Sequence, residues 1–244
     1  MSERDRDRYR LSFDSVAEAY ERSRPLYAAT SLVWLGRRLP LRRVLDLGAG
    51  TGKLTRQLVA LGADVVAVEP GAEMRRVFAR VLPDVELLAG SAEEIPLADA
   101  SVDVVTAAQS FHWFDRERSL PEMYRVLRAG GGVALVWNEW DLEDPLVKSL
   151  DEVVDRLRPP WRREPQWEHP LDDLSLFGNQ ELQTFGHVRE LEVESIVEFV
   201  SSMSALVQAD AADRERAFAD IRALIGSGPV HLPLVTTVAV ADRA

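Results

Sequence analysis

A glycine-rich turn between an apolar run and a helical pattern constrains this chain more than any other feature. Four residues of strand composition, Val44 to Leu47, lead into glycines at alternate positions, Gly48, Gly50 and Gly52. Leucines at 54, 58 and 61 then follow at helical spacing. Glycines at such a junction let the backbone turn tightly and admit a ligand close to its N–H groups. The junction therefore predicts an α/β fold with a ligand site at the end of its first strand.

The next apolar run ends in an acidic residue. Residues 65–68 are all valine or alanine, and Glu69 follows them directly. A carboxylate at the end of a strand can accept hydrogen bonds from both hydroxyls of a ribose. The order of strand, glycine turn, helix, strand and acid therefore predicts a nucleotide-cofactor site.

The spacing of the glycines narrows the choice of nucleotide. A dinucleotide-binding turn needs small residues at the later glycines of Gly-x-Gly-x-x-Gly, and Lys53 stands at the third when the count starts at Gly48. A phosphate-binding P-loop would need glycine in place of Leu47 and a hydroxyl in place of Leu54. The spacing therefore disfavours both a nicotinamide oxidoreductase and a P-loop enzyme.

Apolar patterns of alternating period continue up to residue 137. Met74, Val77, Phe78 and Val81 have the i, i+3, i+4, i+7 spacing of a helix face. Alternation of strands with helices requires a mostly parallel sheet that is covered on both faces. We predict strands at 44–47, 64–68, 85–88, 102–107 and 133–137, and helices at 52–61, 72–82 and 117–127.

The flanking parts of the chain lack this alternation. A helical pattern starting near residue 13 should end at Pro25, and a second helix is predicted at 28–39. Five prolines interrupt residues 138–180, of which only 145–157 has a helical pattern. Beyond them we predict a strand at 182–192, helices around 196–203 and at 211–225, and a buried last strand at 235–240.

Composition argues against several classes of function. A net charge of −11 disfavours non-specific nucleic-acid binding. The chain has no cysteine and its four histidines lack metal-ligand spacing, so we expect no metal. No apolar stretch approaches the roughly 20 residues of a membrane helix, and residues 1–10 are too charged for a signal peptide. We expect a cytoplasmic protein that binds neither nucleic acid nor membrane, with its oligomeric state left open.

Several motifs in order resemble those of the class I S-adenosylmethionine-dependent methyltransferases. They are the glycine loop at 46–52, the second strand with its acid at 65–70, a loop at 90–96, a fourth strand at 101–105 and a turn at 126–132. Residues 108–114, Ala-Gln-Ser-Phe-His-Trp-Phe, are similar to a branch that includes small-acid methyltransferases of the trans-aconitate type. The likeness is strong over roughly residues 10–137 and weak elsewhere.

The resemblance implies a doubly wound, mostly parallel sheet of seven strands with an antiparallel last strand and helical elaborations. It also implies one methyltransferase domain over residues 1–244. The expected parts are an N-terminal helical lid (1–40), a cofactor-binding core (41–137), an irregular insertion that caps the substrate (138–180), and C-terminal strands and helices (181–244).

By the same resemblance, S-adenosylmethionine would lie over the glycine loop with Glu69 on its ribose. Asp46 would contact the ammonium group, directly or through water, or brace the turn. Relatives commonly bind adenine with an aspartate where this chain has Ser91, so Glu93 or the backbone around Ala92 would replace that contact. The expected cofactor-binding residues are Asp46, Gly48, Ala49, Gly50, Gly52, Glu69, Pro70, Met74, Ser91, Ala92, Glu93, Gln109, Tyr20 and Arg24.

Fewer residues of the sequence point to the site of the methyl acceptor. Phe13, Tyr20, Arg24 and Tyr27 match a run that covers the cofactor as a lid in the resembling family. His112 follows the fourth strand and could act either as a general base or as a hydrogen-bonding wall residue. The expected substrate-binding residues are His112, Trp113 and Tyr27.

These features predict methyl transfer from S-adenosylmethionine to a small molecule, at an oxygen of a carboxylate or hydroxyl. A carboxylate nucleophile would need no general base, which fits the absence of an obvious base from the loop at 108–114. The alternative is a catalytically silent module that binds S-adenosylmethionine and acts through a partner.

Overall fold

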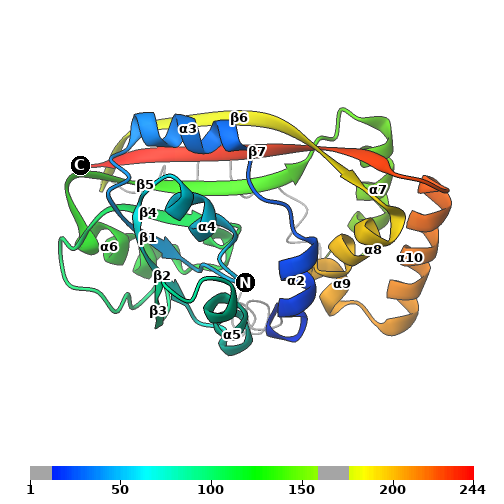
Figure 1. Cartoon of the computed structure of the whole chain (residues 1–244), viewed down its shortest axis with the longest axis horizontal. Helices are drawn as coiled ribbons and strands as arrows, with labels where there is room; N and C mark the ends of the chain where they lie inside the picture. Colours follow the sequence, from blue (N-terminus) through cyan, green and yellow to red (C-terminus); the bar gives the residue numbers. More distant parts are fainter. Residues whose placement is uncertain (1–12, 159–175) are drawn as a thin grey trace.

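The computed structural model of the chain describes residues 13–158 and 176–244. Within these residues seven strands form one sheet, in the order β3-β2-β1-β4-β5-β7-β6 (Figure 1). The strands are β1 (Arg43–Leu47), β2 (Asp64–Glu69), β3 (Glu86–Ala89), β4 (Val102–Ala108), β5 (Leu127–Trp140), β6 (Phe177–Leu191) and β7 (Val230–Arg243).

The pairing confirms the predicted mostly parallel sheet with an antiparallel last strand. β1 pairs in parallel with both β2 and β4, and β4 pairs in parallel with β5. β7 runs antiparallel to both of its neighbours, β5 and β6. The strand order reverses at β1, with β2 on one side and β4 on the other, and ligands bind at the carboxyl edge of such a reversal.

Helices cover both faces of the sheet. Leu35 of α3 (Ala29–Arg38) and Leu58 of α4 (Lys53–Ala60) lie in one apolar cluster with Val104. Met123 of α6 (Arg116–Val126) lies in another cluster with Val105, the next residue along β4, whose side chain points to the opposite face. α5 (Ala72–Val81) contacts β2 and β3. Although residues 1–40 were predicted as a lid, α3 therefore belongs to the layer that covers the sheet.

A second apolar cluster lies beyond the carboxyl ends of β5 and β6. It is formed mainly by α7 (Pro145–Asp155), α8 (Val193–Ser201), α9 (Ser204–Gln208) and α10 (Ala211–Ile225). Figure 1 shows these helices gathered at one end of the molecule, with α2 (Ala17–Ser23) between them and the sheet. We call α7 to α10 the helical group.

Local sequence explains where the helical group begins. The Asp144 carboxylate accepts hydrogen bonds from the N–H groups of Leu146 and Val147, and Pro145 occupies the first turn. Asp210 likewise accepts from the N–H of Asp213 at the start of α10. Acceptor side chains of this kind satisfy the unpaired donors of a helix N-terminus.

The largest differences from the predicted elements lie in the second half of the chain. Residues 138–140 continue β5 instead of starting an irregular segment, and the helix predicted at 145–157 is α7. The expected role of 138–180 as a substrate cap stays a prediction. Residues 159–175 of that segment lie outside the described residues. β7 extends beyond the predicted 235–240 at both ends, because it pairs with β6 over almost its whole length. The short elements η2 (Phe111–Trp113) and α9 were not predicted.

Candidate active site

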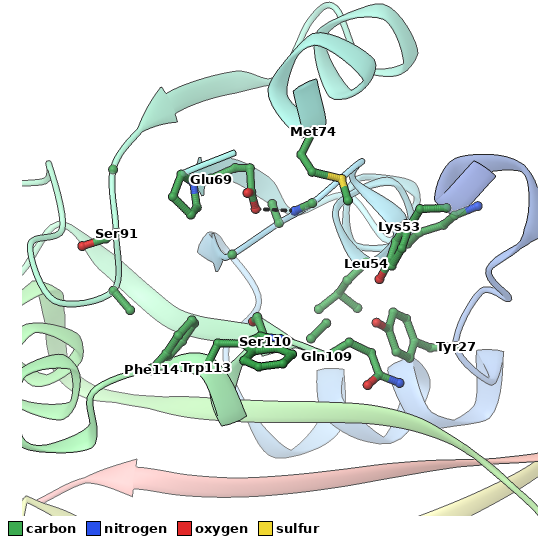
Figure 2. A pocket seen from close by; sticks show the side chains of 18 residues that line it. Tyr27, Lys53, Leu54, Glu69, Met74, Ser91, Gln109, Ser110, Trp113 and Phe114 are labelled. Atoms are coloured by element: carbon green, nitrogen blue, oxygen red, sulfur yellow. Dashed lines mark hydrogen bonds between the residues drawn. The ribbon is translucent and has the colours of Figure 1, made fainter. Parts of the chain in front are cut away.

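A cavity of about 810 Å³ lies at the carboxyl edge of the sheet. Figure 2 shows Tyr27, Lys53 and Gln109 at one end of it, with Ser91 and Phe114 at the other. We call it the main cavity. Its lining residues are Tyr20, Tyr27, Gly48, Ala49, Gly50, Lys53, Leu54, Glu69, Pro70, Met74, Gly90, Ser91, Ala92, Ala108, Gln109, Ser110, Trp113 and Phe114.

The three glycines of the loop have left-handed backbone conformations but different surroundings. A Cβ on Gly48 would lie 2.7 Å from the Cβ of Ser110, whereas a Cβ on Gly50 would meet nothing within 4 Å. A Cβ on Gly52 would lie 2.6 Å from the Leu82 side chain. Gly52 does not line the main cavity, and its expected contact with the cofactor stays a prediction. Its role is to let α4 begin close to the Leu82 side chain.

Glu69 lies in the wall of the main cavity, and its side chain is held by the loop. One carboxylate oxygen accepts from the N–H of Gly50 and the other from the N–H of Gly71, each at 2.8 Å (Figure 2 marks the first). Burial raises the pKa of Glu69 to about 7, and these two bonds oppose the rise. Each oxygen keeps a lone pair, so the ionised carboxylate fits a pair of ribose hydroxyls.

Asp46 lies beneath the loop and is fully buried. Its oxygens accept hydrogen bonds from the hydroxyls of Thr55 at 2.5 Å and Thr106 at 3.1 Å. Burial raises the pKa of Asp46 to about 6, and both hydroxyls lower it. Asp46 does not line the main cavity, so the geometry fits the bracing role, and contact with the cofactor stays a prediction.

Another part of the wall of the main cavity bears on how adenine could be bound, by Glu93 or by the backbone around Ala92. Pro70, Met74, Ser91 and Ala92 all line it, as expected for an adenine site. Glu93 does not, because its carboxylate accepts from the N–H of Asp115 at 2.9 Å, at the start of α6. The geometry therefore favours the backbone around Ala92 over Glu93 as the adenine contact, and the contact itself stays a prediction.

A second cavity of about 320 Å³ adjoins the main one. Tyr20, Tyr27, Lys53 and Gln109 line both cavities, so they mark the boundary between them. Arg24 lines the second cavity and not the main one, and its expected contact with the cofactor stays a prediction. The remaining residues around the second cavity are Pro25, Asn138, Phe199 and Leu234.

Hydrogen bonds from neighbouring elements fix this boundary. The Gln57 side chain bonds both the N–H and the carbonyl of Tyr27, at 3.0 and 2.9 Å. Gln109 has a φ of +55°, uncommon for a residue with a side chain, and donates to the Asn138 carbonyl at 2.5 Å. The Asn138 side chain donates in turn to the Leu26 carbonyl at 3.0 Å. Strained, well-supported residues of this kind cluster at functional sites.

The aromatic loop after β4 contributes Trp113 to the main cavity but not His112. Trp113 is 6% exposed and lines the cavity, whereas His112 lines neither cavity. The two rings lie against each other, with centroids 4.7 Å apart. The structure therefore places His112 in the wall of neither cavity, and its contact with substrate stays a prediction. The Phe13 side chain lies outside the described part of the structure.

Sequence reasoning missed several lining residues. Ser110 was visible in the loop after the fourth strand, but its contact with Gly48 needs the fold. Lys53 was used only to exclude other nucleotides, yet it lines both cavities and pairs with Glu21 at 3.5 Å. The lining residues not predicted are Lys53, Leu54, Gly90, Ala108, Ser110 and Phe114.

No group of three or more His, Asp or Glu side chains among the described residues could hold a metal ion. None of their helices is long and apolar enough to cross a membrane.

Comparisons with known proteins agree with the geometry of the main cavity. A family model described as a methyltransferase domain matches residues 45–135. An uncharacterised methyltransferase of Mycobacterium tuberculosis is 41% identical over 93% of each chain, and one of Schizosaccharomyces pombe is 32% identical over 89% of this chain and 88% of its own. A solved structure assigned as a type II methyltransferase from Anaeromyxobacter dehalogenans has a TM-score of 0.66 at 28% identity, covering 90% of this chain and 97% of that one. The chain therefore belongs to the class I S-adenosylmethionine-dependent methyltransferases.

Proposed function

We propose that this methyltransferase acts on an oxygen atom of a small molecule, either a carboxylate or a hydroxyl. The observation that carries the proposal is the second cavity, which shares four lining residues with the main cavity. A side-chain-lined pocket that adjoins the main cavity suits a small acceptor rather than a macromolecule. The family assignment favours this enzyme over a silent binding module.

The residues at the boundary suit an acceptor that needs no base. Bound S-adenosylmethionine would supply an activated methyl group on a sulfonium, at this boundary. Tyr20 and Tyr27 stand there, and burial raises the pKa of both phenols. Neutral phenols can donate a hydrogen bond and exclude water, but they cannot accept a proton from the acceptor. A carboxylate acceptor is already ionised at neutral pH, so this set of residues would suffice to position it.

Titration and a methyl-transfer screen test the proposal. Calorimetry should show binding of S-adenosylmethionine and S-adenosylhomocysteine and no measurable affinity for NADH, because the dinucleotide glycine spacing is absent. Incubation with labelled S-adenosylmethionine and panels of small acids, phenols and amines should label an acid or a phenol. Transfer to amines alone would overturn the oxygen assignment.

We expect binding of the nucleoside part of the cofactor to depend on pH through Glu69. Only the ionised carboxylate can accept both ribose hydroxyls, and its pKa is raised from 4.5 to about 7 by burial. Affinity should therefore fall by up to about tenfold per pH unit below that pKa and stay level above it. Titration with adenosine is the measurement, because adenosine has no group that titrates near neutral pH.

The stability of the unliganded protein should also depend on pH through Glu69. The folded state binds the Glu69 proton more tightly than the unfolded chain does, so this contribution is fully present below pH 4.5 and lost as pH rises through about 7. The loss should be smaller in Glu69→Gln, which cannot ionise. Adenosine affinity that does not change with pH would contradict the assigned protonation.

His112→Ala should leave turnover within about twofold of wild type, the scale of a substitution that changes no key contact. The reason is that His112 lines neither cavity. A general base contributes about 100-fold or more, so the two roles are well separated. The measurement is kcat together with cofactor affinity on the same preparation. A loss of about 100-fold in kcat alone would restore His112 as the base.

A further inference from the structure

Arg24 brings a fixed guanidinium group to the second cavity. Its Nε donates to the Ser202 hydroxyl and its Nη2 to the Ser202 carbonyl, both at 2.8 Å. The rings of Tyr20 and Phe199 each lie 5.2 Å from its central carbon. Within the described residues Nη1 has no hydrogen-bond partner. The group is therefore held in place with donors to spare.

This cation lacks a compensating carboxylate. Among the described residues no acidic oxygen lies within 4.0 Å of the Arg24 guanidinium, and burial lowers its pKa. Arg22, two residues earlier in α2, contrasts with it, since it pairs with Glu198 at 2.6 Å. A partly buried charge without a partner costs folding free energy, so a retained one points to a ligand of opposite sign.

The surroundings of Arg24 add positive charge in a protein whose net charge is −11. Lys53 lines the same cavity, and the acid that pairs with it among the described residues, Glu21, is shared with Arg56 at 2.6 Å. Arg189 lies near enough to lower the pKa of Lys53, and its own guanidinium donates to a backbone carbonyl at 2.9 Å. No carboxylate of the described residues lines the second cavity.

We propose that the second cavity binds an anionic group of the methyl acceptor, with Arg24 as the residue that selects it. The inference rests on the proposed function and adds a substrate class to it. Arg24 lines the second cavity only, so the anion it holds lies beyond the boundary where the methyl group is transferred. The acceptor therefore carries two functions, an anionic anchor and a separate oxygen that is methylated.

The chemistry of the step is consistent with this arrangement. When the second function is a carboxylate, its oxygen forms a C–O bond to the methyl carbon while the C–S bond breaks. The products are an ester and a neutral thioether, with no proton to remove. The planar guanidinium fork matches a carboxylate in two hydrogen bonds, which an ammonium group does not.

Binding of defined anions tests the inference without a known acceptor. The probes are malonate, succinate, glutarate and 4-hydroxybenzoate, with succinamide and 4-hydroxybenzamide as neutral counterparts. Each is titrated calorimetrically into the protein, with and without saturating S-adenosylhomocysteine. At least one anion should bind, and its neutral counterpart should not.

Variants at Arg24 and at nearby Arg22 then locate the anion site. Arg24→Gln should weaken binding of that anion by about 10–150-fold, the scale of hydrogen bonds to a charged group, and leave S-adenosylhomocysteine affinity within a few-fold. Arg22→Gln removes the same charge from an exposed position and should change anion binding by less than about twofold. If Arg24→Gln does not fold, Arg24→Lys keeps the charge but not the fork and should lose about tenfold.

Three outcomes would overturn the inference. They are binding of no anion in the panel, equal binding of an acid and its amide, and equal effects of the Arg24 and Arg22 variants. These results are distinguishable from failure of the proposed function, which would appear as no S-adenosylhomocysteine binding or as methyl transfer to amines alone.

Discussion

Replacing Glu69 by glutamine should weaken binding of S-adenosylhomocysteine by about 1.5–3 kcal/mol, or roughly 10–150-fold. The carboxylate already accepts one backbone N–H on each oxygen, from Gly50 and Gly71, and offers its remaining lone pairs to the cavity. The amide keeps one acceptor but replaces the other with a donor, so it cannot accept both ribose hydroxyls. Calorimetric titration above pH 8 measures the difference with the wild-type carboxylate ionised.

Glu93→Gln is the matched control for this substitution. Glu93 lies in the loop beside Ser91 and Ala92, but its carboxylate caps the start of α6 through Asp115 and does not line the main cavity. Its replacement should leave S-adenosylhomocysteine affinity within about twofold. Equal losses in the two variants would show that the effect is general charge removal. An unchanged affinity in Glu69→Gln would mean that the ribose lies elsewhere.

Replacing Gly48 by alanine should lower the free energy of unfolding by about 2–5 kcal/mol. The backbone φ of Gly48 is +69°, which costs about 1–2 kcal/mol for a residue with a side chain. Its new Cβ would also lie 2.7 Å from the Cβ of Ser110, and relieving such overpacking costs about 1–3 kcal/mol more. Urea unfolding of the unliganded protein measures the sum.

Gly50→Ala separates the two contributions. Gly50 has a similar φ of +58°, but a Cβ there meets nothing within 4 Å, so it should show only the backbone cost of about 1–2 kcal/mol. The double variant Gly48→Ala with Ser110→Gly should recover part of the loss, because it removes the contacted side chain. Equal destabilisation by the two alanine variants would show that the loop moves to avoid the contact.

Local sequence was enough to predict the half of the molecule that surrounds the glycine loop. The run from Val44 to Leu47, the glycines and Glu69 are close in sequence, and parallel strands bring their carboxyl ends to one edge. The period of the apolar residues then fixed the strands and helices up to β5 within a few residues. The roles of the individual loop residues could not be predicted from the local sequence. Gly52 lets α4 begin close to Leu82, and Asp46 is held by the hydroxyls of Thr55 and Thr106, so both roles depend on partners from other elements.

The acceptor side could not be predicted in the same way, because its contacts join distant parts of the chain. Arg24 is held by Ser202, 178 residues later, and Tyr27 is held by Gln57 from α4. Nothing in the local pattern around Ser202 marks it as a partner for an arginine. The polar stretch of β6 lacks the alternation of a half-buried strand, since six successive residues in it are exposed. Its extent therefore emerges only from its pairing with β7.

The placement of β7 between β5 and β6 has a consequence for the order in which the protein can fold during synthesis. In the described structure β6 pairs with β7 alone, and β7 leaves the ribosome after β6 and α8 to α10. The strands that carry the glycine loop and Glu69 pair with neighbours made before residue 140. Leu234, a wall of the second cavity, belongs to β7 itself. A nascent chain can therefore assemble its cofactor cradle while the acceptor cavity is still missing a wall.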